Sequence, residues 1–146
     1  MNQPHYAFTH ASKKKTFSFY SLGRQGKIKK VVQFKLIEDE VYNLGFGDYS
    51  VKLKSLDDKV VTDNGDMEKV LATVIAITEH FFNGHPNARI FLTGSNTART
   101  RLYQIIINIH FEALIQDYEI FGFLDDEWCL FQKNINYESF LIFKLL

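Results

Sequence analysis

The chain has 146 residues, of which 46% are hydrophobic and 23% are charged, and this composition argues against a disordered segment or a repeat array. A chain of this size predicts a single globular domain over residues 1–146. The 17 basic and 17 acidic residues cancel, which disfavours a general polyanion-binding protein. No segment approaches the roughly 18 consecutive apolar residues of a membrane span, and the N-terminal residues do not resemble a signal peptide. We therefore expect a cytoplasmic protein that does not contact a membrane.

Charge is distributed unevenly along the chain. The first acidic residue is Glu38, and eight of the 17 basic residues precede it. Residues 38–146 carry the other nine together with all 17 acidic residues, so the two parts have net charges of +8 and −8. Two explanations remain open: a basic surface that binds phosphate groups, or a basic hairpin that docks on the acidic remainder of the same chain.

Alternating apolar and polar residues predict a strand meander in the first third of the chain. Residues 16–21 and 27–37 alternate in this way, and the glycine-containing stretch "LGRQG" between them predicts a hairpin loop. Residues 40–46 predict a third strand, which we expect to end in a turn at "GDYS". A fourth strand is expected from residue 51.

The second predicted strand places its lysines on two different faces. Lys30 falls among the apolar residues, whereas Lys27, Lys29 and Lys35 fall on the opposite face. Lysines and aromatic residues such as Tyr20 can share one face of a sheet, an arrangement that suits the binding of single-stranded nucleic acid. We therefore expect a basic surface on this hairpin.

Residues 62–86 carry the signals of a helix at both ends. Asn64 or Asp66 can cap its start, whereas Gly84 and Pro86 are typical of its end. Its apolar residues recur at steps of three and four, which predicts a helix that lies on the sheet. The residues of this stripe are Val70, Leu71, Val74, Ile77, Thr78, Phe81 and Phe82.

The next segments predict a buried strand and a second helix. "ARIFLT" is mostly apolar, as in the interior of a sheet, and "SNTARTRLYQIIINIHFEALIQD" follows it. We expect this helix to be buried on much of its circumference. Its apolar stripe comprises Leu102, Ile105, Ile106, Ile109 and Ala113, widened by Ile107, Phe111 and Leu114.

Three further strands are predicted near the end of the chain: "EIFGFL", "EWCLFQK" and "ESFLIFKLL", the first two joined at Asp125 and Asp126. Cys129 alternates with large apolar residues and is interpreted as a small core residue. The order of elements predicts an α+β fold with an antiparallel N-terminal strand meander, a central helix–strand–helix unit and C-terminal strands. We expect a single layer of helices on a mixed or antiparallel sheet.

The stretch "TGSNTARTRLYQ" places two arginines in the first turn of the second predicted helix. Helix N-termini carry a partial positive charge and normally attract acidic residues, so arginines there indicate an anion-binding corner. Unpaired N–H groups of the first turn and a flexible glycine can approach a ligand closely. We expect the anion to be a phosphate group. The candidate residues are Gly94, Ser95, Thr97, Arg99, Arg101 and Tyr103.

Helical geometry separates the two arginines. Residues 99 and 101 lie about 200° apart around a helix, so we expect one of them to face a ligand rather than both. Tyr103 lies four residues after Arg99 on the same face and could stack on the guanidinium or on a base. The alternative is that the arginine pairs with a carboxylate of the same chain, and Asp48 and Asp66 are the candidates.

No other motif indicates a cofactor, a metal or a covalent catalyst. "GRQGK" lacks the spacing of a phosphate-binding loop, the histidines lack the spacing of zinc ligands, and no serine lies in a nucleophile elbow. An enzyme remains an alternative. If Asp48, Asp66, His80 or His110 met the arginines, the set would suit a metal-independent ribonuclease, as in the toxin of a toxin–antitoxin pair.

Three segments, "YNLGFGDY", "DNGDMEKVLATV" and "TGSNTARTRLYQ", resemble a family of small bacterial proteins of uncharacterised function. The resemblance extends from about Tyr6 to Phe143. It implies a stand-alone domain and supplies no catalytic residues to carry over.

These observations predict a domain whose anion-binding corner serves nucleic-acid or nucleotide-related binding, with a phosphorylated small molecule as the other candidate ligand. The basic hairpin would extend that surface, and no cofactor is expected. Besides the ribonuclease, the alternative is a protein-interaction module or a homodimer without a ligand, because 22 aromatic residues exceed the needs of one small core.

Overall fold

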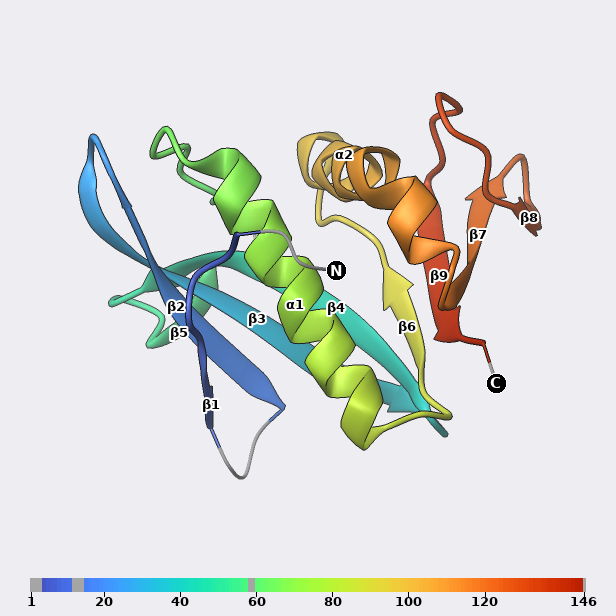
Figure 1. The fold of residues 1–146 in the computed structure, drawn as a ribbon, viewed down its shortest axis with the longest axis horizontal. Helices are drawn as coiled ribbons and strands as arrows, with labels where there is room; N and C mark the ends of the chain where they lie inside the picture. The colour runs from blue at the N-terminus through green and yellow to red at the C-terminus, as the bar shows by residue number, and fades with distance from the viewer. Residues whose placement is uncertain (1–3, 12–14, 58–59, 146) are drawn as a thin grey trace. The chain divides into compact units, whose positions relative to one another are not determined.

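The computed structural model describes residues 4–11, 15–57 and 60–145 and has the α+β fold that the sequence predicts (Figure 1). Its strand order is β1-β2-β3-β4-β6-β9-β7-β8, with β5 paired to β4 outside this order. The sheet is mixed, because β4 and β6 pair in parallel whereas β2 and β3 pair antiparallel. The elements are β1 (Thr9–Ala11), β2 (Thr16–Gly23), β3 (Gly26–Glu38), β4 (Val41–Ser50), β5 (Ser55–Asp57), α1 (Met67–Gly84), β6 (Arg89–Leu92), α2 (Thr97–Leu114), β7 (Tyr118–Leu124), β8 (Glu127–Leu130) and β9 (Ser139–Lys144).

The chain divides into two compact units. Unit 1 comprises the described residues up to Lys35 together with Gly45–Gly84, and unit 2 comprises Leu36–Leu44 and the described residues from His85 onward. β3 and β4 each contribute residues to both units. The single domain expected over residues 1–146 therefore stays a prediction. Among the described residues, neither helix has the length and hydrophobicity that crossing a bilayer requires.

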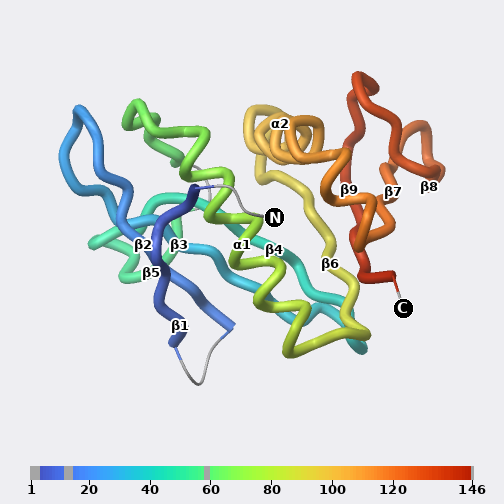
Figure 2. The backbone as a smooth tube through the Cα atoms, in the orientation of Figure 1, coloured from blue at the N-terminus to red at the C-terminus, as the bar shows by residue number. Residues whose placement is uncertain are grey.

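Unit 1 is built on the predicted hairpin and the first predicted helix. The register of β2 and β3 runs from Thr16 opposite Gln33 to Gly23 opposite Gly26, so the connection is a tight turn (Figure 2). α1 packs on one face of these strands, where the rings of Phe34 and Phe81 stack with centroids 4.1 Å apart. The predicted apolar stripe of this helix is buried except for Thr78, which is half-buried.

β4 is longer than the sequence predicts. It continues through "GDYS" to Ser50, and the turn follows over residues 51–54. Two glycines explain the difference, because a Cβ at Gly45 would lie 3.0 Å from Leu56 Cδ2 and one at Gly47 would lie 2.4 Å from Asp57 O. Their missing side chains let β5 fold back over β4. The glycines therefore serve close packing within the sheet instead of ending the strand.

Unit 2 contains the second predicted helix, but this helix is rotated relative to the prediction. Ile105 and Ile109 are 40% and 59% exposed, whereas Tyr103 and His110 are buried. The Tyr103 hydroxyl on this face has a polar partner, because Tyr103 OH donates to Leu44 O at 3.4 Å. The buried residues of α2 are Arg99, Tyr103, Gln104, Ile106, Ile107, His110 and Leu114.

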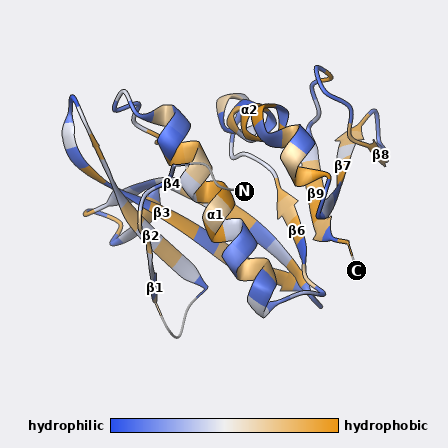
Figure 3. Cartoon of the chain, viewed as in Figure 1, coloured by the Kyte–Doolittle hydropathy of each residue, from blue (hydrophilic) through white to orange (hydrophobic). Residues whose placement is uncertain are grey.

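The C-terminal strands are confirmed, with one correction to their core. β9 lies between β6 and β7, and β8 is the outermost strand at that end of the order. Cys129 is exposed, so its interpretation as a core residue is wrong. An outermost strand has a partner on one side only, and all four residues of β8 are exposed. β6 is predominantly hydrophobic, as expected for an interior strand (Figure 3).

Candidate functional site

The predicted anion-binding corner begins α2 where expected, but hydrogen bonds within the corner use many of its polar groups. The Asn96 side chain accepts a hydrogen bond from Arg99 N at 2.9 Å and caps the helix. Thr100 Oγ1 accepts from Gly94 N at 3.1 Å and donates to Asn96 O at 3.2 Å. A Cβ at Gly94 would lie 2.3 Å from Thr100 N, so close packing within the corner already requires a glycine.

The two arginines have different environments, in line with their predicted separation around the helix. Arg99 is 5% exposed, and its guanidinium carbon lies 5.9 Å from the centre of the Tyr103 ring. Arg101 is exposed and lines a cavity of about 460 Å³. Gly94 and Thr97 also line this cavity, whereas Ser95 does not. The remaining lining residues are Thr93, Thr100, Gln104, Asn136, Tyr137 and Glu138.

The two carboxylates considered as partners of the arginines are engaged within unit 1. Asp48 Oδ1 lies 2.5 Å from Lys30 Nζ, and the Lys30 side chain is completely buried. Asp66 Oδ2 accepts hydrogen bonds from Tyr6 OH at 2.5 Å and from Ser21 Oγ at 2.6 Å. The pKa of Tyr6 is raised above its ordinary value of 10.0, because burial disfavours the phenolate and Asp66 accepts the hydrogen bond of the neutral phenol.

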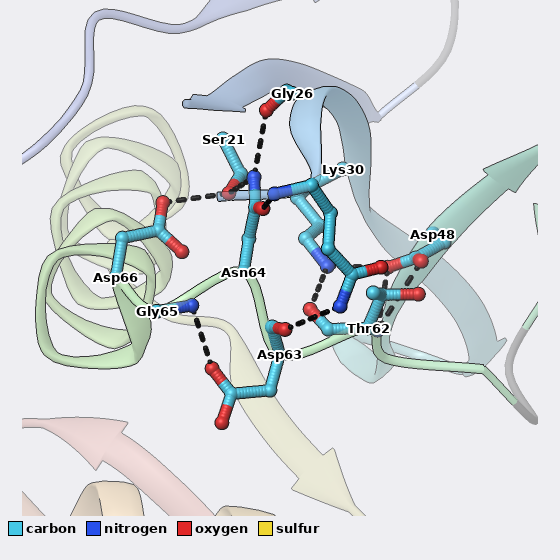
Figure 4. Close-up of polar contacts among 10 residues, drawn as sticks. Ser21, Gly26, Lys30, Asp48, Thr62, Asp63, Asn64, Gly65 and Asp66 are labelled. Atoms are coloured by element: carbon cyan, nitrogen blue, oxygen red, sulfur yellow. Dashed lines mark hydrogen bonds and ion pairs between the residues drawn. The ribbon is translucent and has the colours of Figure 1, made fainter. Parts of the chain in front are cut away.

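These carboxylates belong to a polar network that fixes the loop over residues 62–66 to the β2–β3 hairpin (Figure 4). Asn64 is 1% exposed; its Oδ1 accepts from Gln25 N at 2.6 Å and its Nδ2 donates to Gly26 O at 2.8 Å. Lys30 Nζ also donates to Thr62 O at 2.8 Å. The placement of Lys30 among apolar residues in the sequence was the signal for this buried pair. The sequence does not predict its partner, because it places Asp48 in a turn, whereas the structure places Asp48 in β4.

The lysines predicted to form a basic surface lie on the face of β3 opposite Lys30. Lys27 Nζ lies 4.3 Å from the centre of the Tyr20 ring, and Lys29 Nζ lies 4.4 Å from the centre of the Tyr49 ring. Tyr20 and Lys29 are directly opposite each other in the register of β2 and β3. Lys35 is exposed farther along the same side of β3. We call Tyr20, Lys27, Lys29, Lys35 and Tyr49 the basic face.

A cavity of about 310 Å³ adjoins the basic face and is shared by β1 to β5. Its charged and titratable lining residues among the described residues are Lys29, Lys54, His10 and Tyr49, with no aspartate or glutamate. Ser18 and Gln33 add polar groups that can donate hydrogen bonds. The cavity therefore combines positive charge, hydrogen-bond donors and an aromatic ring.

No group of three histidine, cysteine, aspartate or glutamate side chains suited to a metal ion occurs among the described residues. Comparison with curated proteins gave no match, and comparison with solved structures gave none. One protein-family model, described as "Family of unknown function (DUF6934)", matches residues 2–145. The match covers nearly the whole chain, including the segments that contribute the basic face and the α2 corner. The chain therefore belongs to this family of unknown function.

Proposed function

We propose that this domain binds single-stranded nucleic acid on the basic face of unit 1, and that it does so in the cytoplasm. The observation that carries the proposal is the pairing of Lys27 with Tyr20 and of Lys29 with Tyr49 on one side of the sheet. Lysine ammonium groups neutralise backbone phosphates, whereas tyrosine rings provide surfaces on which bases stack.

The arrangement of the strands places these groups in rows. Alternate residues of one strand lie about 6.6 Å apart on the same side, so Lys27 and Lys29 form a short row of positive charge. Tyr20 is 44% exposed, which leaves part of its ring accessible to a base. The adjoining cavity adds the ammonium group of Lys54 and the imidazole ring of His10 beside this row.

A local basic face is compatible with a chain that is neutral overall. Association with a polyanion depends on the potential at the contact surface more than on net charge, because opposite charges beyond about 10 Å are screened at 0.1 M salt. The basic excess before Glu38 supplies this face. The first explanation of the charge asymmetry, a basic surface for phosphates, is therefore the one on which the proposal rests.

Titration of fluorescently labelled single-stranded RNA and DNA at two salt concentrations tests the proposal. Lys29→Gln and Tyr20→Ala should weaken binding, and Lys29→Gln should reduce the slope of log affinity against log salt by roughly 0.7. Lys69→Gln is the matched control, because Lys69 Nζ lies 4.3 Å from the Tyr6 ring on the helix side of unit 1. Equal affinity of all three variants and the wild type would refute the proposal. Cleavage of the RNA would favour the ribonuclease alternative.

The cavity at the start of α2 supports a second candidate, a site for a phosphorylated small molecule. Its volume of about 460 Å³ suits such a ligand, and the Arg101 side chain forms no ion pair with another described residue. Glu138 in the same lining opposes an anion, so the phosphate would have to lie on the Arg101 side. Calorimetric titration with a nucleoside monophosphate should give binding that Arg101→Ala abolishes and Glu138→Gln strengthens.

A further inference from the structure

The sheet of unit 2 has an apolar outer face. α2, the one helix of this unit among the described residues, lies on the face that contains Ile120 and Ile142, which are 2% and 7% exposed. Burial alternates along β7 and β9, so the intervening residues point to the other side and are half-buried. In a sheet with one solvated face these positions are usually polar. Here they include Phe121, Phe123, Leu141 and Phe143.

The outer face comprises Phe91, Phe121, Phe123, Trp128, Leu141 and Phe143, and its rings form two groups of contacts. Phe121 and Phe143 stack with centroids 5.9 Å apart and an interplanar angle of 15°. The Trp128 ring lies 5.1 Å from that of Phe123 and 6.1 Å from that of Phe91, and this tryptophan is 44% exposed. Contiguous apolar surface of this kind marks an interaction site in a protein.

Two rows of this face are related by symmetry about β9. Leu141 is flanked by Phe91 on β6 and by Phe121 on β7. Two residues farther along β9, Phe143 is flanked by Arg89 on β6 and by Glu119 on β7. Residues of matching size, or of opposite charge, therefore occupy equivalent positions on the two sides of β9.

We infer that the outer face is the interface of a homodimer, with a two-fold axis that runs along β9 between two packed sheets. Such an axis exchanges β6 of one copy with β7 of the other, so Phe91 lies against the partner's Phe121 and Arg89 against the partner's Glu119. An isologous contact requires a surface that complements itself in this way. Packed sheets with nearly aligned strands are a common arrangement.

The charges favour a second copy over a charged partner. Neither Arg89 nor Glu119 forms an ion pair with another described residue, so both are available to a partner. The Arg89 guanidinium carbon lies 5.7 Å from the centre of the Phe143 ring, which keeps it at the rim of the apolar layer. The formal net charge of zero removes long-range repulsion between copies.

Sedimentation velocity over a wide range of protein concentrations tests the dimer. Trp128 is the only tryptophan, so its emission reports on the interface and should shift to shorter wavelength as the dimer forms. Phe121→Ser should abolish both the dimer and the shift. Val51→Ser is the matched control, because Val51 is 82% exposed and belongs to unit 1.

A charge reversal tests the axis without disturbing the apolar layer. Arg89→Glu and Glu119→Arg should each weaken the dimer by about tenfold or more, and the double reversal should restore it. Restoration identifies a second copy with this orientation as the occupant. A monomer at every concentration, or a double reversal no tighter than either single one, would overturn the inference and leave this face to a different protein.

Discussion

Lys30 Nζ lies 2.5 Å from Asp48 Oδ1 in the core of unit 1, where the lysine side chain has no exposed surface. The pair connects β3 to β4, and Thr62 adds a carbonyl acceptor for the lysine and an N–H donor for the carboxylate. A buried charge is tolerated only when it is paired and hydrogen-bonded. A single substitution in this pair should therefore strongly reduce the free energy of unfolding.

Replacing Lys30 by methionine should lower the free energy of unfolding by about 3–5 kcal/mol, because it leaves the Asp48 carboxylate buried without its counter-charge. The double variant Lys30→Met/Asp48→Leu should be more stable than Lys30→Met, since no uncompensated charge remains. Urea unfolding followed by circular dichroism measures both. Lys29→Met on the opposite face is the control, and a loss equal to that of Lys30→Met would contradict the assignment.

Gly23→Ala should destabilise the hairpin, because the added Cβ would lie 1.9 Å from Asn64 O and force the loop over residues 62–66 to move. We expect a loss of roughly 1–3 kcal/mol in unfolding free energy. Gly84→Ala has nothing within 4 Å of the new Cβ and should be neutral or stabilising. Thermal unfolding of the two variants distinguishes these effects, and equal melting temperatures would show that the loop adapts freely.

The Tyr6 hydroxyl should make stability depend on alkaline pH. Its pKa is higher in the folded than in the unfolded chain, mainly through burial, so the folded state favours the protonated phenol. This contribution is complete below pH 10 and disappears as the pH rises through the folded-state pKa. The difference in unfolding free energy between wild type and Tyr6→Phe should therefore shrink from pH 9 towards higher pH. A difference independent of pH would show that the Tyr6–Asp66 hydrogen bond does not bias this titration.

The two arginines of the α2 corner should differ in their effect on stability. Arg99 is buried and packs near Tyr103, so Arg99→Ala should cost more than about 1 kcal/mol of unfolding free energy. Arg101 is exposed, and Arg101→Ala should leave the unfolding curve unchanged. Denaturant titration of both proteins measures the contrast. The reverse order of stabilities would contradict the burial of Arg99.

Strand and helix positions were predictable because hydrophobic periodicity records which side of an element is buried. The same periodicity predicts the wrong buried face for α2, because it includes Ile105 and Ile109, which are 40% and 59% exposed. The buried side instead carries Arg99, Tyr103 and His110, whose side chains combine an apolar body with a polar end. Single-residue hydrophobicity does not distinguish such amphipathic residues from solvated ones.

The sequence predicts only part of the candidate site. The alternation of lysines with apolar residues indicated the basic face, since position along one strand fixes its side. Tyr49 was missed because its approach to Lys29 depends on a neighbouring strand. The two symmetric rows of the outer face of unit 2 were missed likewise, because the positions of Phe91 and Phe121 beside Leu141 follow from the register of three strands.

Because β3 and β4 each contribute to both units, the units are interleaved along the chain and neither can be obtained by truncation. A fragment that starts at His85 would lack Val41–Asn43, the partners of Arg89–Phe91 in β6. It would therefore present β6 as an unprotected edge, which favours aggregation. Tests that separate the proposed nucleic-acid binding from the proposed self-association must therefore use point substitutions in the intact chain.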